Sequence, residues 1–200
     1  MSDIWQQIVT AWQAQSMLEV MAVLAAILYL VLAIKENIWC WLFAFISTGI
    51  YIYLFHSVSL ISESLLNVYY LLMAVYGWYQ WRFGNNHQQR KIIKWSLKKH
   101  LSLIIPTTLA VPILGYFTSQ YGASFPYLDA FTTCFAVLAT VMVAHKVLEN
   151  WHYWLIINSI SIYLFANKAL YLTAAMFALY LVLAVIGIVR WRRHYAAQLA

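Results

Sequence analysis

The sequence predicts an all-α integral membrane protein of seven transmembrane helices, arranged as two parallel three-helix bundles joined by a linker helix. Three observations predict this fold class: an apolar composition, an internal repeat, and basic residues that fall almost entirely on one side. Of the 200 residues, 64% are hydrophobic and 9% are charged, whereas a soluble domain carries about 25% charged residues. We therefore expect a single membrane unit with no added soluble domain.

The second half of the chain repeats the first at an offset of 110 residues. Over 53–82 and 163–192, eleven of thirty positions are identical, including Tyr-Leu-Phe and Gly-x-x-x-Trp-Arg in one register. Shared apolar composition would give scattered leucine and alanine matches instead. The same offset pairs Trp41 with Trp151 and Glu19 with Asp129. Such a repeat in an apolar chain is typical of a transporter built from two related bundles.

The apolar segments predict the spans and their topology. A helix needs about 20 apolar residues to cross a bilayer, and we expect spans at 17–34, 38–56, 58–81, 101–119, 127–144, 150–166 and 168–190. Three helices end on the side opposite to their start, so a single linker span lets both bundles insert in the same direction. The repeats are then related by an axis along the membrane normal, an arrangement that resembles SWEET-type carriers.

This topology divides the chain into five parts. They are an N-terminal interfacial segment (1–16), a first bundle (17–82), a cytoplasmic connector with the linker helix (83–126), a second bundle (127–192) and a cytoplasmic tail (193–200). The first part lacks a basic region and a cleavage motif, so we expect an amphipathic segment with Trp5 and Trp12 and no signal peptide.

The basic residues predict the orientation. Eleven of the twelve lie on one side of the predicted spans, and only Lys168 lies on the other. The eleven are Lys35, Arg82, Arg90, Lys91, Lys94, Lys98, Lys99, Lys146, Arg190, Arg192 and Arg193. By the positive-inside rule that side is cytoplasmic, so the N-terminus is outside and the C-terminus is in the cytoplasm. We interpret 82–100 as a connector near lipid headgroups and not as a nucleic-acid patch.

Two sets of side chains share one helical face each and predict a binding site. In 58–81, Glu63, Asn67 and Tyr70 lie on one face, and in 150–166 Trp151, Trp154 and Asn158 do the same. Polar groups within hydrocarbon are costly and usually face a bundle interior or a cavity. We therefore expect substrate to bind between the bundles.

The repeat makes this site asymmetric. Trp154 corresponds to Ala44 and Asn158 to Thr48, while Tyr70 keeps a tyrosine partner, Tyr180. An acid and an amide from one bundle would face two indoles and an amide from the other. That set suits an asymmetric aromatic ligand, because indole faces stack on heteroaromatic rings and attract cations. The candidate substrate-binding residues are Trp151, Trp154, Asn158, Glu63, Asn67, Tyr70, Thr48, Tyr180 and Asp129.

Other interpretations of these residues remain open. Trp151 is equally well placed for an aromatic belt at the membrane interface, and Asn158 for a hydrogen bond that joins two helices. Glu63 is also explained by a protonated carboxyl bonded to a neighbouring helix, and Asp129 by an interfacial anchor. We assign Trp78, Trp81 and Trp191 to the aromatic belt.

The sequence gives little sign of enzyme chemistry. The six histidines lie in loops, at the tail or near span ends, and none has a spacing with Cys or Asp that resembles a metal site. P-loop, dinucleotide and G-x-S-x-G motifs do not occur in it. We expect no cofactor, no metal and no catalytic residue.

At this point the residues resemble a known family, the Pnu-type vitamin transporters. The similar strings are S-E-S-L-L-N-V-Y-Y with Y-G-W-Y-Q-W, within 62–81, and E-N-W-H-Y-W-L-I-I-N-S-I-S, at 149–161; Asp129-Ala130 also fits. The resemblance covers most of the chain. It implies the three-one-three helix fold, a homotrimer with one substrate path per protomer, and facilitated diffusion with trapping by a cytoplasmic kinase. It implies that Trp151, Trp154 and Asn158 bind the substrate's ring.

Within this family the sequence looks more like the thiamine branch (PnuT) than the nicotinamide riboside branch (PnuC). The riboside members tend to carry glutamine where Asn67 stands, and they do not generally carry an acid where Glu63 stands. A carboxyl can bond a ring nitrogen of the aminopyrimidine of thiamine or offset its fixed charge. We therefore expect uptake of a cationic vitamin, thiamine ahead of nicotinamide riboside. Proton coupling through Glu63 and a SWEET-like carrier for a neutral sugar stay open as alternatives, and a membrane-embedded enzyme is a distant third.

Overall fold

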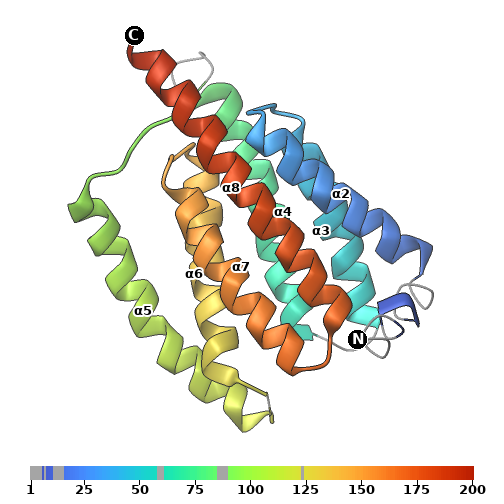
Figure 1. Ribbon diagram of the computed structural model, residues 1–200. Coiled ribbons are helices and arrows are strands. Elements are labelled where there is room, and N and C mark those ends of the chain that lie inside the picture. Colours follow the sequence, from blue (N-terminus) through green and yellow to red (C-terminus); the bar gives the residue numbers. More distant parts are fainter. Residues whose placement is uncertain (1–5, 7, 11–15, 58–60, 85–89, 123) are drawn as a thin grey trace.

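The computed structural model describes residues 6, 8–10, 16–57, 61–84, 90–122 and 124–200, and in these ranges the chain forms helices joined by turns and irregular segments, with one isolated bridge between Ile93 and Val147. Trp5 and Trp12 of the predicted interfacial segment lie outside the described residues. The main helices, labelled in Figure 1, are α2 (Met17–Ile34), α3 (Cys40–Ser57), α4 (Ile61–Phe83), α5 (Leu97–Gln120), α6 (Pro126–Ala144), α7 (Asn150–Asn167) and α8 (Tyr171–Leu199).

These bounds agree with the predicted spans to within four residues, apart from one end. The last helix, α8, continues to Leu199 instead of ending near residue 190. Among the described helices, α2, α5, α6 and α8 are each long and apolar enough to cross a membrane. The structure is therefore an all-helical membrane fold.

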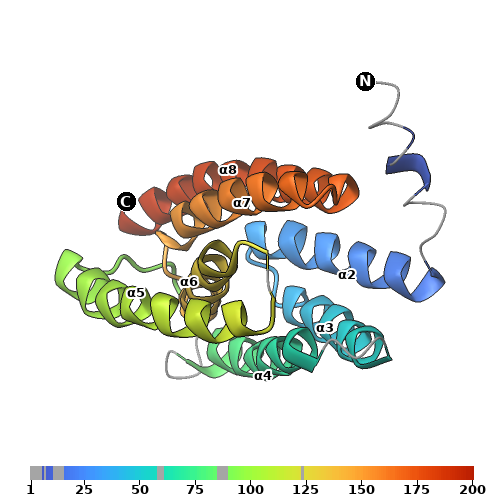
Figure 2. The same ribbon diagram turned by 90° about the horizontal axis from the view of Figure 1, so that it is seen from below.

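The helices pack as two groups of three with α5 at the side. Helices α2, α3 and α4 form an N-terminal group, in which α3 contacts both others, and α6, α7 and α8 form a C-terminal group, in which α7 contacts both others. The groups meet where α4 contacts α6 and where α2 contacts α8. Seen from below, α6 lies between α4 and α7 (Figure 2).

Helix α5 is the most peripheral element. Among the described helices it packs mainly against α6, and its first turn also contacts α7, where the ring of His100 stacks on Tyr153 and Nδ1 lies 2.8 Å from the Tyr153 hydroxyl. The contact with α6 is close at Gly115, where an added Cβ would lie 2.4 Å from Cδ1 of Tyr127. Its opposite face exposes Leu101, Ile105, Leu109 and Ile113. These apolar side chains recur every four residues, so one stripe of α5 is suited to contact lipid.

Helices α2 and α6 begin differently but end in the same way. Ser16 and Glu19 form a capping box at the start of α2, and Pro126 opens α6. At the other ends, Glu36 and Lys146 have φ angles of 54° and 51°. The backbone N–H of the following residue donates to the carbonyl five residues before it, Asn37 to Leu32 and Val147 to Met142. This is the hydrogen bond of a Schellman motif. Both turns are thus left-handed at a residue other than glycine.

The conserved pairs of the internal repeat are explained by packing. In the N-terminal group the ring of Trp41 lies on Gly77, and in the C-terminal group the ring of Trp151 lies on Gly187. A Cβ at Gly77 would come within 2.3 Å of Cη2 of Trp41. The absence of a side chain is therefore what lets α3 approach α4, and α7 approach α8, through an indole.

We expect Gly187→Ala to lower the melting temperature of the protein in detergent. The new Cβ would lie 2.5 Å from Cδ2 of Trp151, and overpacking of a core typically costs about 1–3 kcal/mol. Thermal unfolding followed by tryptophan fluorescence measures the change.

The matched control is Gly49→Ala, because the nearest atom to a Cβ there is Cδ1 of Leu71 at 3.9 Å. Alanine is favoured over glycine inside a helix by about 1 kcal/mol, so this variant should melt at or above the wild-type temperature. Equal melting temperatures for the two variants would contradict the close packing of Trp151 on Gly187.

Candidate functional site

The basic turns of the two groups meet at one end of the molecule. The turn at 35–39, the turn at 145–149 and the connector segment 90–96 are joined there by hydrogen bonds. We call this the basic end. Lys168, by contrast, lies at the end where α6 begins and binds Asp129.

Two tryptophans tie the groups together at the basic end. The indole N–H of Trp81 on α4 donates to the carbonyl of Val143 on α6, at 3.1 Å. The indole N–H of Trp191 on α8 donates to the carbonyl of Ala33 on α2, at 3.2 Å. The repeat offset of 110 relates both the donors and the acceptors. Each group therefore donates to the other at the equivalent position.

The prediction that Trp81 and Trp191 belong to an interface belt is wrong. Trp81 is 3% exposed and Trp191 is 0% exposed. Belt tryptophans need a wet end for the indole N–H, whereas these find a backbone carbonyl in the opposite group. Their rings lie 6.4 Å apart between centroids. Trp78, in contrast, is exposed on α4, as a belt residue would be.

An ion pair crosses the same boundary. Nζ of Lys146 lies 3.0 Å from Oε2 of Glu36, and the two side chains are 7% and 10% exposed. The ammonium also lies over the ring of Trp81, 4.5 Å from its centroid, and Nδ1 of His194 contacts the other carboxylate oxygen of Glu36. A buried charge is stable only when it is paired and hydrogen-bonded. Glu36 and Lys146 therefore hold each other in place.

The connector is fastened to the turn that follows α6. Arg90 donates from Nε to the carbonyl of His145 at 3.0 Å, and its Nη2 lies 2.9 Å from Nδ1 of the same residue. Since guanidinium only donates, Nδ1 accepts, so Nε2 carries the proton and donates to the Tyr76 hydroxyl at 2.9 Å. Backbone hydrogen bonds join Ile93 to both sides of the same turn. The connector is thus part of the closed basic end.

The predicted face of α7 points into the protein. Trp151 is buried and meets Trp191 edge to face, with centroids 5.4 Å apart. Trp154, a turn deeper, is half-buried and packs against both hydrophobic clusters of the core. Asn158, at the next turn, is 3% exposed and makes no side-chain hydrogen bond to the described residues. Nε1 of Trp151 is likewise buried without a hydrogen-bond partner among the described residues.

The N-terminal group supplies fewer described contacts. Tyr70 is half-buried on α4 with its ring against Tyr69, and Asn67 is half-buried one turn earlier. The Thr48 hydroxyl donates within α3, to the carbonyls of Ala44 and Phe45. Glu63 falls in α4, but its side chain lies outside what the structure describes. Its role stays a prediction.

Helix contacts limit how these residues meet. Among the described helices α4 does not pack on α7, because α6 contacts both. The Tyr69 hydroxyl spans the gap to α6 and donates to the carbonyl of Val137 at 3.1 Å. Tyr180 lies on α8 with its ring against Phe177, near Tyr51 of the N-terminal group. The described candidate residues therefore lie on several helices of both groups, and the contacts given above do not bring them into one cluster.

Asp129 has a defined partner. Its Oδ2 accepts from Nζ of Lys168 at 2.7 Å, which joins the start of α6 to the turn after α7. The repeat equivalent, Glu19, serves instead in the capping box of α2. The two acids share a position in the repeat but have different roles.

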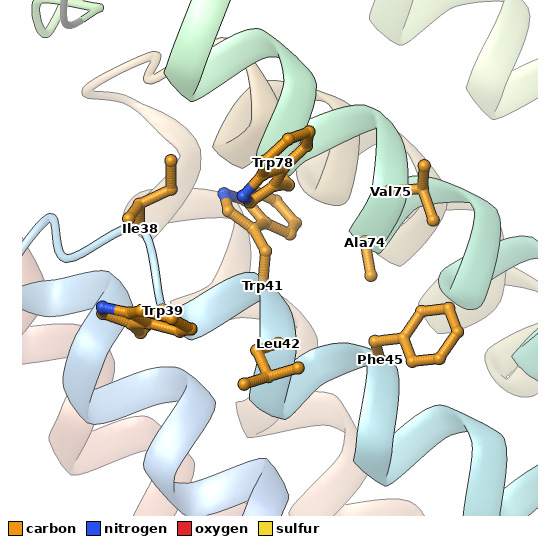
Figure 3. A pocket seen from close by; sticks show the side chains of 8 residues that line it. All are labelled: Ile38, Trp39, Trp41, Leu42, Phe45, Ala74, Val75 and Trp78. Atoms are coloured by element: carbon orange, nitrogen blue, oxygen red, sulfur yellow. The ribbon is translucent and has the colours of Figure 1, made fainter.

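A pocket of about 260 Å³ lies on the outer side of α3 and α4, near the basic end (Figure 3). None of the predicted site residues lines it. Its walls are apolar and are formed by Ile38, Trp39, Trp41, Leu42, Phe45, Ala74, Val75 and Trp78. The pocket is thus separate from the candidate substrate residues.

The sequence analysis missed the cross-group contacts at the basic end. One signal for them was available: Glu36 and Lys146 are repeat equivalents of opposite charge. The other was the retention of Trp81 and Trp191 beside the glycine that each repeat keeps. Both signals require the two repeats to be placed face to face, which the sequence alone does not do.

The fold is that of a helical membrane transporter. It is similar to a solved structure, "Crystal structure of the Vitamin B3 transporter PnuC", with a TM-score of 0.73 and 23% sequence identity, over 97% of this chain and 88% of that one. The model of the nicotinamide mononucleotide transporter family matches residues 16–193, so the chain belongs to that family.

Two bacterial proteins with similar sequences agree with this assignment. The nicotinamide riboside transporter PnuC of Escherichia coli K12 is 25% identical, over 86% of this chain and 82% of its own length. PnuC of Haemophilus influenzae is 27% identical, over 96% of this chain and 85% of its own length. The resemblance to Pnu-type transporters is confirmed, and the protein is a transporter and not an enzyme.

We expect the stability of the protein to fall as pH is lowered from about 7.5 to about 5.5. Burial, then the charges of Arg90 and Lys99, lower the pKa of His145 below its ordinary value, which is about 6.5. The unfolded chain therefore binds the proton more readily, and folding is disfavoured as pH falls through this range. Thermal melts across the range measure the effect.

The variant His145→Gln should show a smaller fall in melting temperature over the same range, because it removes the titrating group. His56→Gln, at the far end of α3, is the control and should behave like wild type. An unchanged pH dependence in His145→Gln would show that His145 is not the responsible group.

Proposed function

We propose that this protein carries nicotinamide riboside across the bacterial inner membrane by facilitated diffusion. The observation that carries the proposal is the set of relatives named as nicotinamide riboside transporters, which match 86% to 96% of this chain. They favour the riboside, the alternative of the sequence analysis, over thiamine. Thiamine specificity rests on Asn67, Glu63 and the likeness of 36–41 and 63–70 to the thiamine branch, and it receives no support from the comparisons.

The chemistry of the candidate residues suits this substrate. Nicotinamide riboside has a cationic pyridinium ring and a carboxamide that both donates and accepts hydrogen bonds. The half-buried indole of Trp154 offers a face for the ring, and such a cation–π contact is worth about 0.5–2 kcal/mol. The buried amide of Asn158 has no described partner and would pair with the carboxamide. Asn67, Tyr70, Thr48 and Tyr180 would complete the site from α4, α3 and α8.

Trp151 and Asp129 take supporting places in this proposal. Trp151 forms the floor under Trp154, packed on Gly187. Asp129 holds the turn after α7 through Lys168, at the end from which substrate would enter. Glu63 would add an acid near the same entrance, where proton coupling through it stays an alternative.

We further propose that α2 to α8 all cross the membrane, as two three-helix bundles (17–82 and 127–192) joined by α5. The basic end would face the cytoplasm, with the N-terminus outside. The gathering of the turns at 35–39 and 145–149 with the connector at one end supports this orientation, since basic residues favour the cytoplasmic side. A homotrimer with one path per protomer remains the expected assembly.

Transport would follow the gradient of the substrate. A cytoplasmic kinase that phosphorylates the riboside would keep its concentration low inside. The membrane potential adds about 2.3 kcal/mol per 100 mV for one positive charge that moves inward. No coupling ion is required by this scheme.

We expect nicotinamide riboside to bind the purified protein and thiamine to bind at least tenfold more weakly. Trp154→Ala should raise the Kd for the riboside about tenfold, because loss of a cation–π contact of about 1.4 kcal/mol corresponds to that factor. Asn158→Ala should do the same by leaving the carboxamide unpaired. Isothermal titration calorimetry measures each Kd.

The control is Trp39→Ala, which removes an exposed indole from the outer pocket and should leave both affinities unchanged. Tighter binding of thiamine than of nicotinamide riboside would contradict the proposal and would assign the protein to the thiamine branch. Inhibition of vitamin binding by sugars would favour the SWEET-like alternative.

A further inference from the structure

The pair formed by Glu36 and Lys146 has a symmetry that the other ion pairs lack. The two residues stand 110 positions apart, so each is the repeat equivalent of the other. They face one another from the turns after α2 and α6, at 3.0 Å. A residue meets its own equivalent only near the axis that relates the two groups. The pair therefore marks that axis at the basic end.

The backbone at these positions is unusual as well. Both residues adopt positive φ angles, 54° for Glu36 and 51° for Lys146. Glycine is the ordinary residue there, since a side chain makes the left-handed conformation unfavourable. A charged residue is held in this conformation twice, at equivalent positions, although it is neither glycine nor asparagine. Ala169, just after α7, has the same conformation, with a φ of 57°, so it is the ion pair that sets Glu36 and Lys146 apart from this other left-handed turn.

The pair joins the two groups, whereas the pair of Asp129 and Lys168 lies within the C-terminal group. Separation of the groups at the basic end must therefore break the contact between Glu36 and Lys146. It must also break the bonds of Trp81 and Trp191 to the opposite backbones. In the closed state the charges are buried and paired, and in an open state water would hydrate both. An ion pair thus allows closure without making opening prohibitive.

We infer that Glu36 and Lys146 form the cytoplasmic gate of the transport path. The gate is closed in this structure, and the two groups must part at this pair to release substrate. The inference rests on the proposed transport function and orientation. It assigns the contact that controls access to the substrate path from the cytoplasmic side. In the closed state the ring of Trp81 lies under the ammonium of Lys146, and Nδ1 of His194 contacts the carboxylate of Glu36.

Cys40 provides a natural reporter of opening. It begins α3 and is fully buried in the cluster that includes Ala33, Trp41 and Ala144. We would replace Cys134 with serine throughout and measure alkylation of Cys40 by a membrane-impermeant maleimide. Inverted vesicles expose the cytoplasmic side, and right-side-out vesicles expose the other. The experiment uses no substrate, so its result is independent of whether the riboside binds.

We expect Glu36→Gln and Lys146→Met each to raise the alkylation rate at least tenfold in inverted vesicles. Electrostatics alone would move the two variants in opposite directions, since loss of an anion favours the reactive thiolate and loss of a cation disfavours it. A rise in both therefore reports opening. The matched control is Lys35→Gln, which removes an exposed cation from the same turn and should leave the rate unchanged.

The symmetric exchange Glu36→Lys with Lys146→Glu should return the rate to within threefold of wild type, because it restores a pair of opposite charges at the same two positions. Wild-type rates in both single variants would overturn the inference, as would an exchange variant as fast as the singles. Acceleration only in right-side-out vesicles would overturn it too. If either single variant fails to fold, the exchange variant is compared with wild type alone, and an alkylation rate more than threefold above the wild-type rate would overturn the inference.

Discussion

The architecture depends on one reciprocal interaction, the pair of indole–carbonyl hydrogen bonds that join the two helix groups. Trp81 and Trp191 each cap a backbone carbonyl near the end of a helix in the other group. Each carbonyl also accepts a backbone N–H of the turn that follows its helix, Ala33 from Glu36 and Val143 from Lys146. The indole therefore uses the second lone pair of the carbonyl, and its own N–H gains a partner that would be costly to leave unmade in a membrane protein. The two bonds define how the groups meet. Gly77 and Gly187 leave room for the rings of Trp41 and Trp151, so α3 packs closely on α4 and α7 packs closely on α8.

The scaffold is nearly symmetric, and it departs from symmetry at residues to which we assign substrate recognition. Trp154 and Asn158 occupy positions at which the first repeat has Ala44 and Thr48. Thr48 bonds to its own helix, while the amide of Asn158 has no described partner. In the proposed function a nearly symmetric scaffold would let the two groups rock against each other, and an asymmetric lining would recognise a molecule with two different ends. The two requirements are met by different residues of the same helices.

Much of the fold followed from sequence because hydrophobic length and the repeat constrain helices strongly. The spans agree with the helices to within a few residues, and only α8 runs on, since Arg190 and Arg193 lie on helical turns beyond its apolar part. The candidate site was predicted only as helix faces. Periodicity says which residues share a face, but the partner of that face depends on tertiary packing. The placement of α6 between α4 and α7 is of this kind. Trp81 was misassigned for the same reason, because a tryptophan at a helix end has the same sequence pattern in a belt and in a core.

The ion pair on the symmetry axis has a consequence for the history of the chain. If each three-helix group descends from one ancestral unit that paired with a copy of itself, a position on the axis would have held two identical residues. Two glutamates or two lysines there would repel. Opposite charges became possible only after the two copies were encoded separately, within one chain. On that premise the salt bridge between Glu36 and Lys146 became available only when the two groups had different sequences, and a homodimer with its axis at this position is unable to form it.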